Sequence, residues 1–490
     1  MLDVRIHDKY QIEFKTHYRF KKSEKSTAYA LEIYVFASNS LDLNPGSYPK
    51  YLFYRDLQTY LRLETPKIAL RHIVSGRQNP FENLAAGFQD LASDPSIPQY
   101  VDNYVNQLKM FCCVTRRAMS EHIALVSRKT KPGSIDRLVE KYLSHSRNIL
   151  QQYRSLRACV SYPSFDRKSF NLFIIIDEYL SLFTEEYSYR LLNTLKKKGL
   201  ANWDAHKKAI LELIVEETDY RKSQGYLVAA SENDSNERLV HQTQSLKKYT
   251  ESVLFLKTRS RQEGKLAQQM IFGVAAGLAM IWATAVALYA QYKFGIFTMA
   301  FFLTLVGSYI LKDRIKELVK EYLSNKLLRF FYDQKIKICT TARKNRIGAS
   351  RESFSFVNDE GLDNDIMELR NRDEMSQLGE YSVGEQVILY RKKIEVFQTH
   401  FDQVYKDLKI KGVTDITRYS VARMTQKMGN PKRQLYITDG EDYKRISARK
   451  VHHINFIIRY SENGKSNLKR FRLVMDRGGI RRLEEVSLAS

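Results

Sequence analysis

Two long apolar runs separated by three residues limit most strongly how this chain can fold. Residues 270–290 read MIFGVAAGLAMIWATAVALYA and residues 294–311 read FGIFTMAFFLTLVGSYIL, with no charged residue in either run. A helix needs about 20 apolar residues to cross the hydrocarbon core of a bilayer, and about 17 is the practical minimum. Only Gln291, Tyr292 and Lys293 separate the runs, which leaves room for a tight antiparallel turn. The sequence therefore predicts a transmembrane helical hairpin with spans at 267–290 and 294–311.

Charged residues on the two flanks predict the orientation of this hairpin. Lys257 and Arg261 precede the first run, Lys312 and Arg314 follow the second, and the turn holds only Lys293. Cytoplasmic loops carry an excess of Lys and Arg. We therefore expect an N-in, C-in protein of the inner (plasma) membrane, with most of its mass in the cytoplasm. Its four cysteines form no CxxC pair, which is typical of a reducing compartment.

Small residues in the first run and apolar repeats outside the membrane extend this prediction. Gly273, Ala276 and Gly277 are predicted to pack closely, because small residues let helix backbones approach each other in a bilayer. Their partner is either the second span or the first span of another subunit, so a homo-oligomer is expected. Apolar residues at helical spacing continue on both sides of the hairpin. We expect an antiparallel cytoplasmic stem whose seam is formed by Leu239, Leu246, Val253 and Leu318.

The rest of the N-terminal half predicts strands followed by helices. Residues 10–20 and 28–38 alternate between apolar and polar side chains, with the period of a half-buried strand. These two segments predict an N-terminal β-hairpin. Residues 49–261 carry apolar stripes at helical spacing, broken by Pro and Gly, which predicts a cytoplasmic helix bundle.

The C-terminal part predicts one helix and then a sheet. Residues 387–408 carry a further stripe at helical spacing, and turn residues then separate apolar segments at 434–438, 451–460, 468–475 and 480–485. These segments predict a C-terminal antiparallel β-meander. The expected fold class is an α+β membrane protein in four parts. They are an N-terminal β-hairpin at 1–47, a helical domain at 48–235, the transmembrane hairpin with its stem at 236–335, and an α+β domain at 336–490.

No motif indicates catalysis, a cofactor or a metal site. An apolar segment ending in Asp177 and Glu178 resembles part of a nucleotide-hydrolysing site, but the chain lacks the phosphate-binding loop GxxxxGK[ST]. These two carboxylates are therefore predicted to lie on the polar face of a helix. His452 and His453 are neighbours in a predicted strand, so their rings point to opposite faces and cannot share a metal. We expect no cofactor, and a non-enzymatic role is favoured.

The net charge of +24 indicates anionic partners. The candidate face for such a partner lies in the C-terminal sheet and consists of Arg470, Arg472, Arg481 and Arg482. Three interpretations remain open for this face: an ordinary solvated surface, a site for anionic lipid or acidic protein, and a site for single-stranded nucleic acid. Lipid or acidic protein is favoured over nucleic acid because a domain under a cytoplasmic leaflet already faces anionic lipid.

Three functional hypotheses follow for a chain embedded in the lipid bilayer. The first is a non-enzymatic membrane-anchored scaffold or sensor with large cytoplasmic domains, assembled as an oligomer. The second is an oligomeric channel built from transmembrane hairpins. The absence of acidic, basic or histidine residues within either run disfavours an ion-coupled transporter. The third is a membrane-tethered enzyme whose site is assembled from scattered residues.

Overall fold

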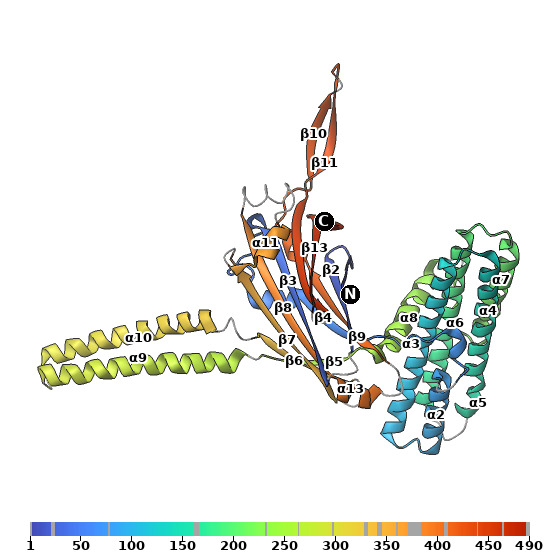
Figure 1. The fold of residues 1–490 in the computed structure, drawn as a ribbon, viewed down its shortest axis with the longest axis horizontal. Coiled ribbons are helices and arrows are strands. Elements are labelled where there is room, and N and C mark those ends of the chain that lie inside the picture. Colours follow the sequence, from blue (N-terminus) through green and yellow to red (C-terminus); the bar gives the residue numbers. More distant parts are fainter. Residues whose placement is uncertain are drawn as a thin grey trace.

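A computed structural model describes residues 2–20, 25–76, 79–160, 166–230, 233–262, 264–295, 298–327, 332–340, 345–358, 361–370, 384–405, 410–438, 440–462 and 465–486. The fold mixes helix and sheet, as predicted, with 53% of the described residues helical and 29% in strands. Two antiparallel sheets form the centre (Figure 1). A helix bundle lies on one side of them, and a long hairpin of two helices projects on the opposite side.

The smaller sheet has four strands in the order β1-β2-β9-β4. Its strands are β1 (Leu2–Ile6), β2 (Gln11–Arg19), β9 (Gly412–Ser420) and β4 (Leu57–Leu63). The alternation in β2 buries Ile12, Phe14 and Tyr18 on one face, as the period of two predicts. The opposite face of β2 carries Lys15 and His17, and it faces the helix bundle.

The larger sheet has eight strands in the order β14-β13-β12-β3-β8-β7-β6-β5. They are β3 (Ser26–Ser38), β5 (Lys257–Gln262), β6 (Gln334–Cys339), β7 (Arg346–Val357), β8 (Glu385–Phe397), β12 (His452–Glu462), β13 (Lys465–Asp476) and β14 (Gly479–Val486). The two sheets pack face to face through a shared apolar core. Phe14 of the smaller sheet meets Phe456 of the larger one, with ring centroids 5.5 Å apart.

The predicted N-terminal β-hairpin is wrong in its pairing. β2 pairs with β1 and β9, whereas β3 pairs with β8 and β12 in the other sheet. The burial of β3 explains the difference, because Tyr34, Val35 and Phe36 are all buried and the strand is covered on both faces. A strand with two covered faces gains most from a central position between two neighbours.

The C-terminal strands β12, β13 and β14 pair consecutively and antiparallel, which is the arrangement of a meander. The predicted strand at 434–438 lies outside this sheet. It belongs to a separate two-stranded ribbon, formed by β10 (Lys432–Thr438) and β11 (Tyr443–Arg449), that projects from the sheets (Figure 1). The helix predicted from residue 387 is also wrong in its first half, because β8 occupies residues 387–397 and α13 (Gln398–Tyr405) is the only helical part described.

The helix bundle is formed by α2 (Pro80–Ser93), α3 (Pro98–Arg128), α4 (Pro132–Ser155), α6 (Arg167–Lys196), α7 (Trp203–Ser223) and α8 (Asn233–Glu251), with short α5 (Arg157–Val160) beside it. Proline occupies the first turn of α2, α3 and α4, where its missing N–H leaves no hydrogen bond unmade. Asp166 caps α6 by accepting a hydrogen bond from the Ser169 amide at 3.0 Å. Short helices α1 (Lys50–Asp56), α11 (Asn364–Arg370) and α14 (Ala422–Gln426) lie in the sheet region.

Candidate functional site

The projecting hairpin consists of α9 (Gly264–Phe294) and α10 (Met299–Leu327), and its two helices do not pack through the predicted small-residue face, which leaves another subunit as the predicted partner. Ala275 of α9 and Ser308 of α10 are buried in the contact. Gly273, Ala276 and Gly277 are exposed, and a Cβ atom added at either glycine would meet nothing within 4 Å. The predicted small-residue face therefore points away from α10 and is available to another molecule.

The turn of the hairpin lies further along the chain than predicted. α9 continues through residues 291–293 to Phe294, and the chain then reverses at Gly295, whose φ of 73° lies in the left-handed region. Ile296 and Phe297 of the predicted second span lie outside the described residues. As a result, the described apolar part of α10 runs only from Met299 to Leu311, about 20 Å at the helical rise per residue.

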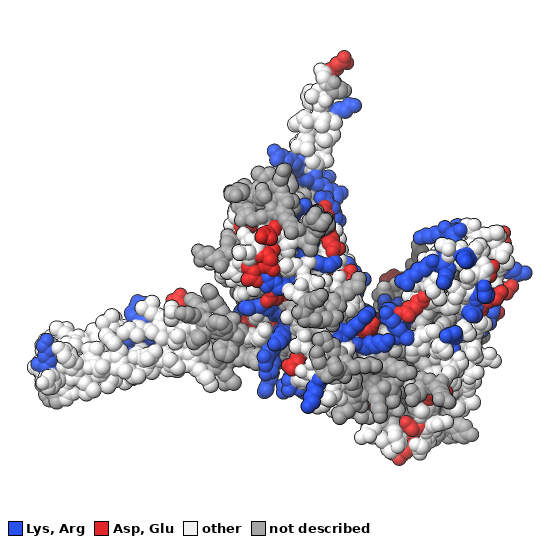
Figure 2. All heavy atoms as spheres, in the orientation of Figure 1, with Lys and Arg blue, Asp and Glu red and all other residues white. Residues whose placement is uncertain are grey.

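Charged residues of α10 begin partway along the hairpin. The Lys320 ammonium lies over the Phe272 ring at 4.4 Å, which shows that these residues of α10 and α9 lie at the same level of the hairpin. Lys312 lies roughly two helical turns closer to the tip, level with Met280 of α9. Figure 2 shows the outer part of the hairpin as largely uncharged, with basic residues at the tip and partway along.

The predicted stem does not form. Leu246 is buried in the helix bundle, and Leu239 and Val253 are half-buried in the same region of the chain. Strand β5 then separates α8 from α9, because residues 257–262 pair with β6 at the sheet edge. Leu318 lies on α10 and is 66% exposed. Helical spacing correctly marked Leu246 as facing a core, but that core belongs to the bundle.

The four arginines of the predicted anionic-partner face do not share one exposed surface. Arg470 is buried, and its Nη1 donates to the Leu369 carbonyl of α11 at 2.7 Å. Arg472 is half-buried and lies 3.8 Å from Glu484 of β14. Two remain at the surface, where Arg481 pairs with Asp476 and Arg482 with Glu484.

A basic cleft lies between the smaller sheet and the helix bundle, with a volume of about 620 Å³. Its floor is the outer face of the sheet. His17 of β2 and Arg62 of β4 both align with Thr414 of β9, so the three side chains form one row across the strands. In the next row Arg19 aligns with Gly412, where a Cβ atom would lie 2.1 Å from the Tyr18 carbonyl oxygen. Glycine is therefore required there.

The opposite wall of the cleft comes from the bundle. Cys113, Arg116, Arg117 and Ser120 lie at helical spacing on one face of α3, and Glu251 follows from the end of α8. Burial raises the pKa of the Cys113 thiol to about 12 and also raises that of Cys112. A thiol with such a pKa stays protonated and is a poor nucleophile. The wall therefore supplies charge and hydrogen bonds rather than a reactive thiolate.

The charge of the cleft is strongly positive. Six lysines and arginines line it against two glutamates, Glu64 and Glu251. Glu251 is already paired with Arg116 at 2.7 Å. Among the described residues, no carboxylate pairs with Arg62. Figure 2 shows Lys and Arg side chains gathered where the sheets meet the bundle. A concave surface lined by one sign of charge concentrates its field and attracts oppositely charged ligands.

Glu13 lies on the same sheet face, beside the cleft, and gives a pH-dependent prediction. Burial alone would raise its pKa, but hydrogen bonds from Arg418, Lys15 and Arg5 outweigh burial and lower the pKa from 4.5 to about 2. Its ionised form therefore stabilises the fold above pH 4.5, and this contribution is lost as the pH falls toward 2. Thermal unfolding across this window should show a steeper loss of stability for the wild type than for Glu13→Gln. Parallel profiles would contradict this role.

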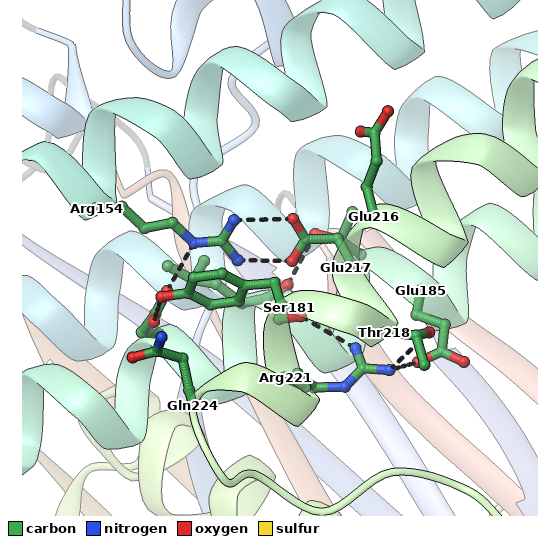
Figure 3. Close-up of polar contacts among 12 residues, drawn as sticks. Arg154, Ser181, Glu185, Glu216, Glu217, Thr218, Arg221 and Gln224 are labelled. Carbon is green, nitrogen blue, oxygen red and sulfur yellow. Dashed lines mark hydrogen bonds and ion pairs between the residues drawn. The ribbon is translucent and has the colours of Figure 1, made fainter.

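A second polar cluster lies within the bundle, where charged groups from three helices pair with one another (Figure 3). Arg154 of α4 donates to both carboxylate oxygens of Glu217 on α7, at 2.9 and 2.6 Å, and to Asp177 on α6 at 3.2 Å. Arg221 of α7 pairs with Glu185 of α6. These contacts join the helices, and Asp177 lies on a helix as predicted, although it is buried. A structural role accounts for this cluster.

Sequence reasoning missed the cleft because its residues come from distant parts of the chain. The only local signal was the polar face of β2, with Lys15, His17 and Arg19 at every second position, which is the pattern of any solvated strand face. Among the described residues, no group of three or more His, Cys, Asp and Glu side chains is placed to hold a metal ion. Comparison of the chain with protein-family models, curated proteins and solved structures gave no match.

Proposed function

We propose that this chain is a non-enzymatic, membrane-anchored scaffold or sensor, held in a bilayer by the α9–α10 hairpin. The exposed apolar surface of this hairpin carries the proposal. The segment Gln268–Phe294 is the one described helix long and apolar enough to cross a membrane, and 17% of its most apolar window is buried. Core helices of soluble proteins also meet that length and composition, but they are mostly buried. Ile281, Leu288 and Phe302 are each more than half exposed.

The lengths and charges of the hairpin suit a bilayer. The apolar run 270–290 of α9 measures about 31 Å at the helical rise, close to the hydrocarbon thickness of about 30 Å. Apart from Lys293 at the tip, both helices together carry no charged residue for about 20 Å. In the proposed arrangement the side chains of Lys312 and Lys293 extend toward opposite interfaces of the bilayer. Local thinning of the bilayer accommodates the remaining difference between the uncharged length of the hairpin and the hydrocarbon thickness. The basic flanks favour an arrangement with the folded parts in the cytoplasm, at the inner (plasma) membrane.

Two exposed surfaces of the chain are proposed to form the contacts with another subunit and with a partner. The first is the Gly273 and Gly277 face of α9, which can receive the same face of another subunit. The second is the ribbon of β10 and β11, where Tyr436 and Tyr443 are 64% and 68% exposed. An isolated two-stranded ribbon is marginally stable in water, so a covering partner would stabilise it. Its exposed Arg433 and neighbouring basic residues suit an anionic lipid or an acidic protein.

Native Cys159 provides a test of the proposed topology, because it is exposed on the bundle whereas Cys112 and Cys113 are buried. In intact cells a membrane-impermeant maleimide should leave Cys159 unlabelled, and permeabilisation should restore labelling. A Cys159→Ser variant identifies the labelled site. Labelling of Cys159 in intact cells would contradict a cytoplasmic bundle, while leaving the membrane anchor itself to be tested separately.

A further inference from the structure

We propose that the basic cleft between the smaller sheet and the helix bundle binds a soluble small molecule that carries two or more phosphate groups. The cleft has a volume of about 620 Å³, within the range of ligand sites in proteins, about 300–1,000 Å³. A smaller cavity of about 180 Å³ adjoins it and shares Arg19, Glu64, Thr65 and Lys67 with it. The second cavity adds Lys411 to the cationic lining.

The charge balance indicates a ligand with several negative charges. Six cationic side chains line the cleft, but Lys15, Arg116 and Arg117 already pair with Glu13, Glu251 and Glu121. The excess positive charge therefore comes from Arg19, Arg62 and Lys67, together with Lys411 of the adjoining cavity, and Glu64 opposes it. Each phosphate monoester carries about −1.5 to −2 at pH 7. Two such groups would therefore offset the excess charge, whereas one carboxylate or one chloride would leave most of it. A ligand with two phosphate groups or a diphosphate therefore fits the cleft best.

Hydrogen-bond donors point to the same class of ligand. The Nε atoms of Arg62 and Arg116 are buried, and neither has an acceptor in the described part of the chain. Arginine presents several N–H groups in a planar fork that matches phosphate oxygens. Thr65 and Ser120 also line the cleft and add hydroxyl groups. A phosphate bound in the cleft would accept from the outer N–H groups of Arg62 and Arg19, which line it.

The position of the cleft favours a soluble ligand over the headgroup of a membrane lipid. In Figure 1 the α9–α10 hairpin and the bundle lie on opposite sides of the sheets. The cleft lies on the bundle side, because α3 forms one of its walls. A lipid held in the membrane that receives the hairpin would therefore have its headgroup on the wrong side of the sheets. A soluble ligand reaches the cleft freely and would couple the bundle to the sheet.

The test is a calorimetric titration of the detergent-solubilised full chain with inorganic pyrophosphate, with orthophosphate as a probe of lower charge. We expect one saturable site, tighter for pyrophosphate and weakened by salt. The variant Arg19→Gln, Lys67→Gln changes two exposed side chains of the cleft. It should bind pyrophosphate about tenfold or more weakly, the effect of losing one charge-assisted hydrogen bond or more. The matched control Arg433→Gln, Arg445→Gln removes the same charge from the exposed ribbon and should bind like the wild type.

Three outcomes would overturn the proposal. They are no saturable binding at low salt, equal weakening by the cleft and ribbon variants, and tighter binding of a short-chain phosphatidic acid than of pyrophosphate. The last would assign the cleft to a lipid headgroup. Arg62→Gln provides a second variant at the row shared with Thr414, and its near-UV circular dichroism checks that the fold persists. If Arg62→Gln folds and binds pyrophosphate as well as the wild type does, the assigned donor is wrong.

Discussion

A Lys392→Met variant is expected to lose about 3–5 kcal/mol of unfolding free energy, because it leaves buried carboxylates without their cation. Lys392 of β8 is buried between the two sheets. Its ammonium lies 2.7 Å from Asp415 of β9 and 3.5 Å from Glu352 of β7, and both carboxylates are almost fully buried. Methionine fills a similar volume but carries no charge. Urea unfolding of the chain in detergent micelles measures the loss.

Two further measurements separate this effect from a general effect of substitution. The neighbouring Lys393 is exposed, so Lys393→Met should change stability by no more than about 0.5 kcal/mol. Burial already raises the pKa of both Glu352 and Asp415. Without Lys392 these carboxyl groups should take up protons more readily, so the deficit of Lys392→Met should shrink as the pH falls. A deficit below about 1 kcal/mol would show that the charges are compensated in another way.

A Val274→Asp, Leu278→Asp, Ile281→Asp variant is expected to lose stable membrane association. All three side chains are exposed on α9, at 54%, 48% and 68%, so the substitutions disturb no packing within the chain. An Asp near the centre of a membrane helix costs about 2.5–3.5 kcal/mol, and three of them oppose insertion strongly. After fractionation of cells, we expect this variant in the soluble or aggregated fraction, and the wild type in the membrane fraction.

The bundle supplies a control of matched composition for this variant. Leu125, Val215 and Val240 are exposed to a similar degree, at 43%, 55% and 55%. Their replacement by Asp adds the same charge and removes similar apolar surface, but it should leave the chain in the membrane fraction. If the hairpin and bundle variants distribute alike, the α9 surface has no special role in anchoring.

The elements that sequence predicted best are those with one buried face. β2 alternates because one face meets the other sheet while Lys15 and His17 face the cleft. The helix prediction over β8 failed because Val387, Ile388 and Leu389 are buried in succession, so the first half of the strand shows no alternation. Val387, Ile394 and Phe401 also lie seven residues apart, which is a helical spacing, and this pattern predicted a helix. A central strand covered on both faces is hard to distinguish from a helix by pattern alone.

Periodicity shows that a face is buried but not what covers it. The helical spacing of Leu239, Leu246 and Val253 correctly indicated that Leu246 is buried, although Leu246 packs in the core of the helix bundle and not in a stem. Likewise, β2 and β9 pair across nearly the whole length of the chain, and no local pattern indicates that pairing. The basic cleft exists only because this pairing sets Arg19 and Arg62 in adjacent rows under α3. A site assembled by long-range pairing therefore has no signature in a short stretch of sequence.

Burial of the α9–α10 hairpin in a lipid bilayer is tested by alkaline carbonate extraction of cell membranes. This treatment releases proteins held at the surface by charge, which matters for a chain with a net charge of +24. We expect the wild-type chain to stay in the membrane pellet after extraction and to enter the soluble phase only with detergent. Recovery of the folded wild-type chain in the carbonate supernatant would contradict it, because the exposed apolar surface of the hairpin would then have to be covered by another protein.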